Sequence, residues 1–296
     1  MQNSLSRLLR SVLYVPASNQ KVLKKAPHLD ADCLILDLED SVPSQLKESA
    51  RILAQETLQK VDNKDILRTV RINSLETDYW IEDVKAVFSG LPDALVVPKV
   101  DSISSLQKLF DLLTKLEEEH SAEFVCPVWA MIESPLGVIN SYTIANHPSV
   151  SCLVMGTSDL GAALGVVPSV DRANMSVSLQ QTVLAAKAAG VGIIDGVFVD
   201  LKNPEGFATQ CRMGADIGFN GKTVIHPSQI LPANKIFLPT EAEVEHARKI
   251  LTSWQRAHSQ GEEICLVDGV LVERLHARRA LEILKSVNEM LGITDL

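Results

Sequence analysis

Pro127-Val-Trp-Ala-Met-Ile-Glu-Ser-Pro135 is an apolar run that leads into one carboxylate, Glu133, and is closed by Ser134-Pro135. Such a run is typical of a β-strand that is buried on both faces, as in a parallel sheet. The next run of this kind, Ser151-Cys-Leu-Val-Met-Gly-Thr-Ser-Asp159, repeats the pattern and ends at Asp159. The sequence therefore indicates two buried strands that each deliver one acid at the carboxyl end.

Glu133 and Asp159 are candidate metal ligands if these two strands are neighbours. Two carboxylates on adjacent strand ends can share one hard cation and leave its other coordination positions to water and to substrate oxygens. The alternative is that each acid only caps the helix that follows its strand. Because the pattern occurs twice in succession, we favour a shared metal ion.

Six further strand-like runs accompany these two, so that eight strands alternate with helical or loop segments. The runs are Val12–Val15, Cys33–Glu39, Leu67–Ile72, Ala94–Lys99, Pro127–Glu133, Cys152–Met155, Gly192–Val199 and one near Ile217–Ile225. Between them, helical spacing predicts core faces at Leu46, Ala50, Leu53 and Thr57, at Ile103, Leu106, Leu109, Leu113 and Leu116, and at Met175, Leu179, Val183 and Ala186.

This alternation predicts a parallel sheet of the α/β class, and eight repeats in a chain of this length favour a closed (β/α)₈ TIM barrel. An open doubly wound sheet is the rival fold. The glycine-rich nucleotide fingerprint that often accompanies that fold is missing from the sequence.

The character of the sequence changes after Pro239. Thr240-Glu-Ala-Glu243 is a capping-box pattern, and it opens a long polar helix that ends near His258. A short turn with glycine and acidic residues follows, and after Gly269 a final helix continues to about Leu291. We expect a TIM-barrel catalytic domain over residues 1–239 and a C-terminal helical arm or lid over residues 240–296.

Composition limits the classes of partner. The 296 residues are 46% hydrophobic and carry a net charge of −9, which argues against nucleic acid as a main partner. No apolar stretch approaches the length of a membrane span, so we expect no membrane partner. Five cysteines without Cys-x-x-Cys spacing are typical of a reducing compartment. We expect the cytoplasm.

In a TIM barrel the active site lies at the carboxyl ends of the strands. The residues at those ends are Tyr14, Pro16, Asp37, Glu39, Asp40, Arg71, Asn73, Lys99, Glu133, Asp159, Asp195, Asp200, Lys222 and His226. Asp37, Glu39 and Asp40 are the densest group, and such acids repel one another unless a cation or an arginine lies among them. Arg71 on the next strand is the natural arginine, and its fork also suits a substrate carboxylate. A purely structural Asp–Arg pair is the alternative.

Lys21 and Lys25 follow the first strand and lie one helical turn apart. A lysine pair at this place could hold phosphates, although surface lysines with this spacing are common.

Several separated motifs together resemble one known family. They are Leu13-Tyr-Val-Pro16, Leu36-Asp-Leu-Glu-Asp-Ser-Val42, Val70-Arg-Ile-Asn73, Val97-Pro-Lys99, Ile132-Glu-Ser134, Ser158-Asp159 and Gly218-Phe-Asn-Gly-Lys-Thr-Val-Ile-His-Pro227. Their identity and order resemble the citrate lyase β-subunit-like family of acyl-CoA lyases, close to citramalyl-CoA and malyl-CoA lyases. The resemblance covers nearly the whole chain.

The resemblance implies a Mg²⁺-dependent enzyme, usually a homotrimer, that cleaves a 3-hydroxyacyl thioester into an acyl thioester and a 2-oxo acid. It implies Glu133 and Asp159 as the ligands of Mg²⁺, and Arg71 as the group that holds the oxo-acid carboxylate. Tyr14, Lys21 and Lys25 then fall where coenzyme A is contacted.

One departure from the family pattern concerns the C-terminal arm. Family members usually carry an aspartate four residues after a glycine, and this acid reaches an active site, often that of a neighbour. Here Gly269-Val-Leu-Val-Glu273 offers Glu273, which is one methylene longer, and Asp268 is the nearest substitute.

We expect one of Asp37, Glu39 and Asp40, or a metal-polarised water, to remove the substrate hydroxyl proton, and Glu273 or a water to protonate the resulting enolate. By family analogy the first choice of substrate is (3S)-citramalyl-CoA, giving acetyl-CoA and pyruvate. The alternatives are a malyl-CoA or methylmalyl-CoA lyase, a citrate lyase β subunit that acts on a carrier-protein thioester, and a non-catalytic barrel that binds an oxo acid.

Overall fold

The computed structural model describes residues 8–60, 66–119 and 125–290. The chain forms two compact units, Met1–Phe237 and Leu238–Leu296, so the division falls two residues before the predicted boundary. Each unit has a hydrophobic core of its own.

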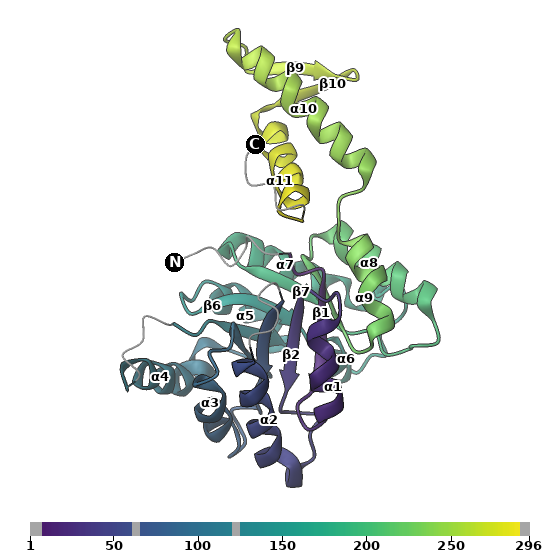
Figure 1. Ribbon diagram of the computed structural model, residues 1–296. Helices are drawn as coiled ribbons and strands as arrows, with labels where there is room; N and C mark the ends of the chain where they lie inside the picture. The colour runs from purple at the N-terminus through teal and green to yellow at the C-terminus, as the bar shows by residue number, and fades with distance from the viewer. Residues whose placement is uncertain (1–7, 61–65, 120–124, 291–296) are drawn as a thin grey trace. The chain divides into compact units, whose positions relative to one another are not determined.

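The first unit, coloured from purple to green in Figure 1, is a closed barrel of eight strands in sequence order. The strands are β1 (Ser11–Pro16), β2 (Cys33–Asp37), β3 (Leu67–Arg71), β4 (Ala94–Val97), β5 (Val128–Ile132), β6 (Val150–Met155), β7 (Gly192–Asp195) and β8 (Gly221–Val224). All neighbouring pairs are parallel, and β8 pairs with β1 to close the ring. The predicted TIM barrel is confirmed, and β5 and β6 are neighbours.

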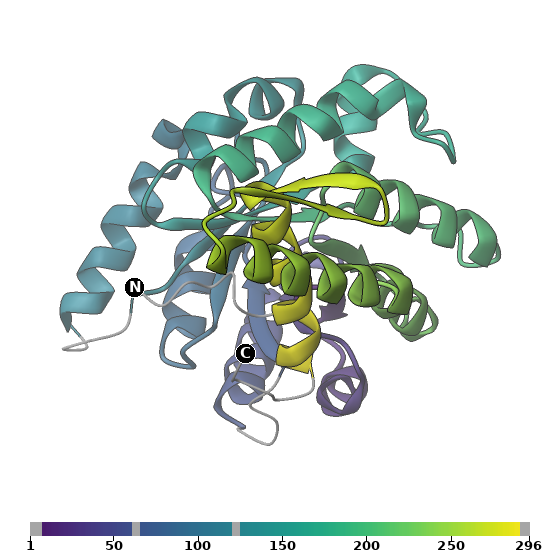
Figure 2. The same cartoon turned by 90° about the horizontal axis from the view of Figure 1, so that it is seen from above.

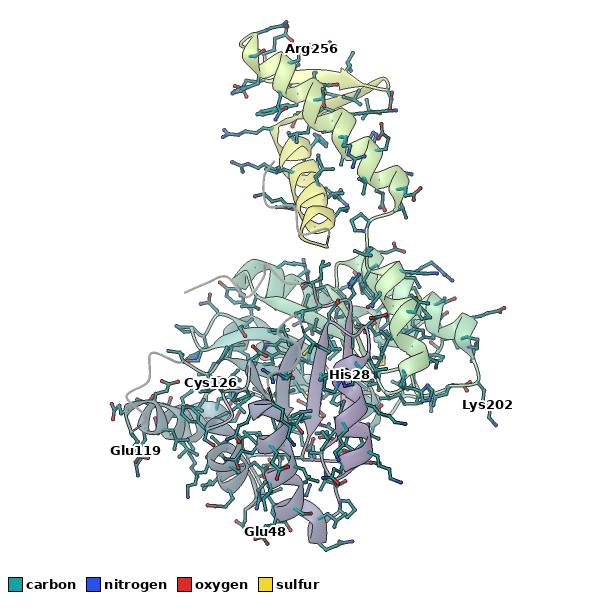
Figure 3. All side chains as sticks on the ribbon, viewed as in Figure 1. His28, Glu48, Glu119, Cys126, Lys202 and Arg256 are labelled. Atoms are coloured by element: carbon teal, nitrogen blue, oxygen red, sulfur yellow. The ribbon has the colours of Figure 1, made fainter. Side chains whose placement is uncertain are left out.

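Helices cover the outside of this barrel (Figure 2). They are α1 (Gln20–Lys25), α2 (Lys47–Gln59), α3 (Trp80–Phe88), α4 (Ile103–Glu119), α5 (Pro135–Ala145), α6 (Thr157–Leu164), α7 (Ser176–Ala189), α8 (Pro204–Ile217) and α9 (Ile230–Ile236), with short 3₁₀ turns at Ala26–His28, Ser44–Leu46, Ala173–Met175 and Pro227–Gln229. Figure 3 shows that the labelled side chains Glu48, Glu119 and Lys202 project from the periphery.

Two of the three predicted helical core faces are largely buried, as expected. One lies along α4, and the other begins at Met175, just before α7, and continues along that helix. The third was right in part. Ala50 is buried and Leu53 packs half-buried against the core, but Ala54 and Leu58 complete the buried face of α2 and Leu46 is exposed. The eighth strand also begins later than predicted. Ile217 ends α8, Gly218 adopts the left-handed conformation (φ 104°) that terminates a helix, and β8 starts at Gly221.

Alternation along the strands separates two cores. Val12, Ile35, Val96, Trp129 and similar residues fill the barrel, whereas their alternate neighbours pack against the helices. Ile193 on β7 and Val224 on β8 belong to the outer core. Asp195 is two residues from Ile193, and Lys222 is two residues from Val224, so each points to the same side of the sheet as that neighbour. Both side chains therefore lie between the barrel and the helices. They do not belong to the barrel mouth, where their strand-end position had placed them.

The second unit, Leu238–Leu296, consists of α10 (Glu241–Ser259), a hairpin of β9 (Ile264–Val267) and β10 (Val270–Glu273), and α11 (Arg274–Met290). The predicted capping box is present, with Thr240 and Glu243 bonded to each other's backbone. The hairpin was missed. Its turn, Asp268-Gly269, has φ of 51° and 80°, the left-handed pair that a two-residue hairpin requires.

Closure of the barrel leads to a first prediction. A Cβ at Gly221 would lie 1.7 Å from the Leu9 carbonyl oxygen, so the Gly221→Ala variant must separate β8 from the chain that leads into β1. We expect a loss of about 3 kcal/mol or more in the free energy of unfolding, measured with urea. Gly190→Ala is the matched control, because Gly190 is left-handed (φ 70°) with nothing within 4 Å, and should lose about 1 kcal/mol. Equal losses would contradict the role of Gly221.

Candidate active site

A cavity of about 370 Å³ opens at the carboxyl ends of the strands. Its walls combine an ionic side with an apolar side, and are formed by Tyr14, Pro16, Asp37, Asp40, Ser41, Arg71, Met131, Met155, Gly156, Thr157, Ser158, Asp159, Val197 and Ile225. Six of the fourteen residues predicted from the strand ends line this one cavity, namely Tyr14, Pro16, Asp37, Asp40, Arg71 and Asp159.

Glu133 and Asp159 lie together at this cavity. Glu133 follows β5 and is 5% exposed, and Asp159 in the first turn of α6 lies close enough for its carboxyl to raise the pKa of Glu133. Burial raises the pKa of Glu133 to about 8, and the neighbouring Asp159 adds to the shift. Glu133 also accepts the Lys99 backbone N–H at 3.2 Å. These two side chains are close enough to bind one ion.

The chemistry of this pair fits Mg²⁺. Among the residues that the structure describes, no three His, Cys, Asp or Glu side chains are grouped to hold a metal ion, and Glu133 and Asp159 form a pair of carboxylates. Mg²⁺ is commonly bound by one or two carboxylates and keeps its other positions for water and substrate. A divalent cation would also compensate the repulsion that raises the pKa of Glu133.

Arg71 on β3 is the centre of the ionic side. It is 8% exposed and binds Asp37 through two bonds, Nε–Oδ1 at 2.7 Å and Nη2–Oδ2 at 2.8 Å. Its Nη1 lies 3.0 Å from Asp40 and 3.1 Å from Glu39. Although burial alone would raise the pKa of Asp37, the Arg71 guanidinium and backbone N–H groups hold it below the usual range.

The three acids after β2 are therefore not equivalent. Asp37 is ionised and accepts hydrogen bonds from Arg71, from Glu39 N and from Ser41 N. Glu39 is 9% exposed, and burial raises its pKa to about 7 while Arg71 opposes the shift. Asp40 is two-thirds exposed. A proton acceptor for neutral pH needs a pKa near 7, so Glu39 is the best candidate among the three.

Lys99 was predicted as a strand-end residue and as part of the Val97-Pro-Lys99 motif, but it was given no role in the site. It has a left-handed backbone (φ 55°), which is uncommon for a residue with a side chain and often marks a functional site. This conformation points its N–H at Glu133, and its Nζ lies 3.8 Å from Glu39. Sequence alone gave no signal of the unusual backbone.

Tyr14 lies within the site, whereas Lys21 and Lys25 do not line the cavity. The Tyr14 ring stacks under Arg71, 4.8 Å from the guanidinium carbon, and burial raises its pKa. Lys21 and Lys25 are exposed on α1 and do not line the cavity. Glu273 ends β10 in the second unit. The Asp268 side chain faces His246 and Lys249 of α10, at 3.9 Å each.

Residues 10–227 match the model of the HpcH/HpaI aldolase/citrate lyase family. The chain is 40% identical over 267 residues to a protein of Cereibacter sphaeroides (strain ATCC 17029 / ATH 2.4.9) named (3S)-malyl-CoA thioesterase, with 90% of each chain covered. It is 30% identical over 275 residues to human mitochondrial citramalyl-CoA lyase, with 89% of this chain and 81% of the relative covered.

A solved structure extends the similarity to the second unit. The CitE protein of Mycobacterium tuberculosis, in complex with magnesium, acetoacetate and coenzyme A, is 26% identical with a TM-score of 0.77. The match covers 95% of this chain and 99% of that one.

The raised pKa of Glu133 leads to a second prediction. The pKa of the Glu133 carboxyl is about 8 in the folded protein, whereas an unfolded chain has a glutamate pKa of about 4.3. Between these two pH values, the folded state therefore keeps a proton on Glu133 that the unfolded chain has lost. Unfolding free energy without metal must therefore fall as the pH rises from 5 to 8. Glu133→Gln removes this contribution, so the variant should lose less stability over that range, measured by urea unfolding in EDTA.

Added Mg²⁺ is the control for this experiment. At pH 8 it should stabilise the parent protein much more than Glu133→Gln, because the variant lacks one of the two carboxylates. Parallel pH curves for the two proteins, or equal stabilisation by Mg²⁺, would contradict the assignment.

Proposed function

Because the chain belongs to the HpcH/HpaI aldolase/citrate lyase family, we propose that it is a Mg²⁺-dependent acyl-CoA lyase whose active site is the cavity at Arg71 and Asp159. The observation that carries this proposal is the close pair Glu133–Asp159, which faces the Arg71 cluster across one cavity. The first candidate reaction is cleavage of (3S)-citramalyl-CoA to acetyl-CoA and pyruvate.

Glu133 and Asp159 would hold Mg²⁺, which when bound supplies a Lewis acid for the hydroxyl and carboxylate of the oxo-acid half. Arg71 would hold that carboxylate through the Nη side of its fork, where exposed Asp40 is its most displaceable partner. The apolar wall at Met131, Met155 and Val197 would shelter the carbon–carbon bond from water.

Glu39 would accept the proton of the substrate hydroxyl, since its pKa is about 7. The electron pair of the O–H bond then forms the carbonyl of pyruvate, and the carbon–carbon bond breaks to leave a thioester enolate. Glu273 would return a proton to the enolate carbon to give acetyl-CoA. Tyr14, Lys21 and Lys25 would contact coenzyme A.

A second candidate is hydrolysis of (3S)-malyl-CoA to malate and free CoA. It is favoured by the 40% identity to the (3S)-malyl-CoA thioesterase of Cereibacter sphaeroides, a higher identity than that to citramalyl-CoA lyase. Both reactions begin with a bound 3-hydroxyacyl-CoA thioester, but they differ in the acyl group and in the bond that breaks.

A product assay separates the candidates. The protein with Mg²⁺ is given (3S)-citramalyl-CoA and (3S)-malyl-CoA in turn, and acetyl-CoA, pyruvate, glyoxylate, malate and free CoA are quantified. Pyruvate with acetyl-CoA supports the first candidate, glyoxylate with acetyl-CoA a malyl-CoA lyase, and malate with free CoA the thioesterase. No turnover of either ester would overturn the proposal in favour of a carrier-protein substrate or a non-catalytic barrel.

Glu273 gives a third prediction. If it protonates the enolate, Glu273→Gln should lower kcat about 100-fold or more, within the range of general acid catalysis, and leave pyruvate binding within about twofold. Glu263→Gln is the control, because Glu263 precedes β9 on the same unit and is exposed. Unchanged turnover in Glu273→Gln would show that another group supplies the proton.

We also propose a cytoplasmic homotrimer. All five cysteines are free, as in a reducing compartment, and no helix among the described residues is long and apolar enough to span a membrane. From Ser134 to Gly190 the only Asp, Glu, Lys and Arg residues are Asp159, Asp171, Arg172 and Lys187, although such residues form 22% of the chain. This depletion is typical of the core of a subunit interface.

The exposed face of α5 and α7 within this region leads to a fourth prediction. The two helices pack side by side and expose Leu136, Ile139, Tyr142, Val177 and Leu184 by 52–77%. We expect the double variant Ile139→Lys/Leu184→Lys to reduce the mass in light scattering from three chains to one. Ile52→Lys, at a residue 53% exposed on α2, is the control and should leave the assembly intact. A trimer that survives the double variant would move the interface elsewhere.

A further inference from the structure

Asp195, at the end of β7, is the centre of a buried ion cluster outside the barrel. Its Oδ1 lies 2.6 Å from Arg172 Nη1, and its Oδ2 lies 2.8 Å from Lys222 Nζ. Asp195 and Lys222 are fully buried, and Arg172 is 2% exposed. None of these three side chains takes part in the mechanism proposed above.

The cluster fixes the peptide that follows β7. Asp195 accepts the Gly196 N–H at 2.8 Å, and Lys222 donates to the Gly196 carbonyl at 2.6 Å. Both polar groups of Gly196 are thus held by the cluster. Gly196 in turn packs directly on Thr157, since a Cβ at Gly196 would lie 2.4 Å from Thr157 Oγ1 and 2.6 Å from its Cγ2.

Thr157 is the first residue of α6, the short helix that carries Asp159. On its other side the chain is equally confined, because a Cβ at Gly156 would lie 2.4 Å from Glu133 Cγ. Gly156-Thr157 is therefore held between Glu133 and Gly196. Any shift of Gly196 must move the start of α6, and with it Asp159, relative to Glu133.

The far end of α6 returns to the same cluster. Leu164 is the last helical residue, and Gly165 caps the helix. The Val166 N–H donates a hydrogen bond to the Gly161 carbonyl, and the loop that follows leads to Arg172. Arg172 has a left-handed backbone (φ 51°) and binds both Asp195 and the Gln210 carbonyl. Asp195 thus anchors both ends of the segment that carries Asp159.

We propose that Asp195, Arg172 and Lys222 are positioning residues that set the distance between the Asp159 and Glu133 carboxylates, and so the affinity for a divalent cation. A buried ion cluster contributes little net stability compared with apolar residues of the same volume, but it fixes directions through its hydrogen bonds. The inference rests on the proposed function only in that Glu133 and Asp159 bind the cation.

The test measures Mg²⁺ binding by calorimetry on the full chain, without a CoA ester. Gly196→Ala pushes on Thr157 and should raise the Kd for Mg²⁺ about tenfold, as is usual when the groups that orient metal ligands are disturbed. Combining it with Thr157→Ala removes the two nearest atoms in its way and leaves only the Met155 carbonyl oxygen at 2.9 Å, so the double variant should return to within about threefold of Thr157→Ala alone. Lys222→Met, which frees Gly196 without a clash, should also raise the Kd about tenfold.

Asp32→Asn is the matched control. Asp32 pairs with Arg10 at 2.6 Å before the strands begin, at the opposite end of the barrel, so its loss should change the Kd by less than twofold. The inference is overturned if Gly196→Ala and Lys222→Met lower the unfolding midpoint but leave the Kd within twofold, if the double variant shows no rescue, or if the parent binds no Mg²⁺. Lyase turnover is scored separately, so shifted Kd values without turnover would overturn only the lyase proposal.

Discussion

The short distance between Glu133 and Asp159 is the constraint on which the remainder of the site depends. Two carboxylates this close, one of them buried, repel each other unless one is protonated or a cation lies between them. The pair arises because β5 and β6 are parallel neighbours and end at the same rim of the barrel. Gly156 leaves no room for a Cβ beside Glu133, so the backbone as well as the charge is adapted to this pair.

Environment gives the clustered acids different chemistry. Asp37 is held ionised by two bonds from Arg71 and by backbone N–H groups, and it serves to orient the guanidinium. Glu39, two residues later, is buried with weaker compensation and titrates near neutral pH. This divergence of pKa values between neighbouring carboxylates is how a site obtains both a fixed charge and a proton acceptor.

The layer between barrel and helices takes part in the site as well. Alternation along β7 and β8 turns Asp195 and Lys222 away from the mouth, yet hydrogen bonds and steric contacts connect them through Gly196 and Thr157 to α6. A charged side chain at a strand end can therefore point either into the barrel mouth or toward the surrounding helices. Its odd or even position along the strand decides which of the two it faces. The region from Ser134 to Gly190, which has few charged residues, includes this segment and contrasts with the charged helices around the other strands.

The sequence by itself determined the eight-stranded barrel, the division near residue 239 and the metal-binding candidates, because apolar runs and their period depend on local composition. It also indicated Arg71 among Asp37, Glu39 and Asp40, because adjacent parallel strands bring such groups together. The sequence did not distinguish Glu39 from Asp37, reveal the backbone of Lys99, or place Asp195 outside the barrel. Those features depend on burial, on φ angles and on the face that each strand residue adopts, and only the closed tertiary structure decides them.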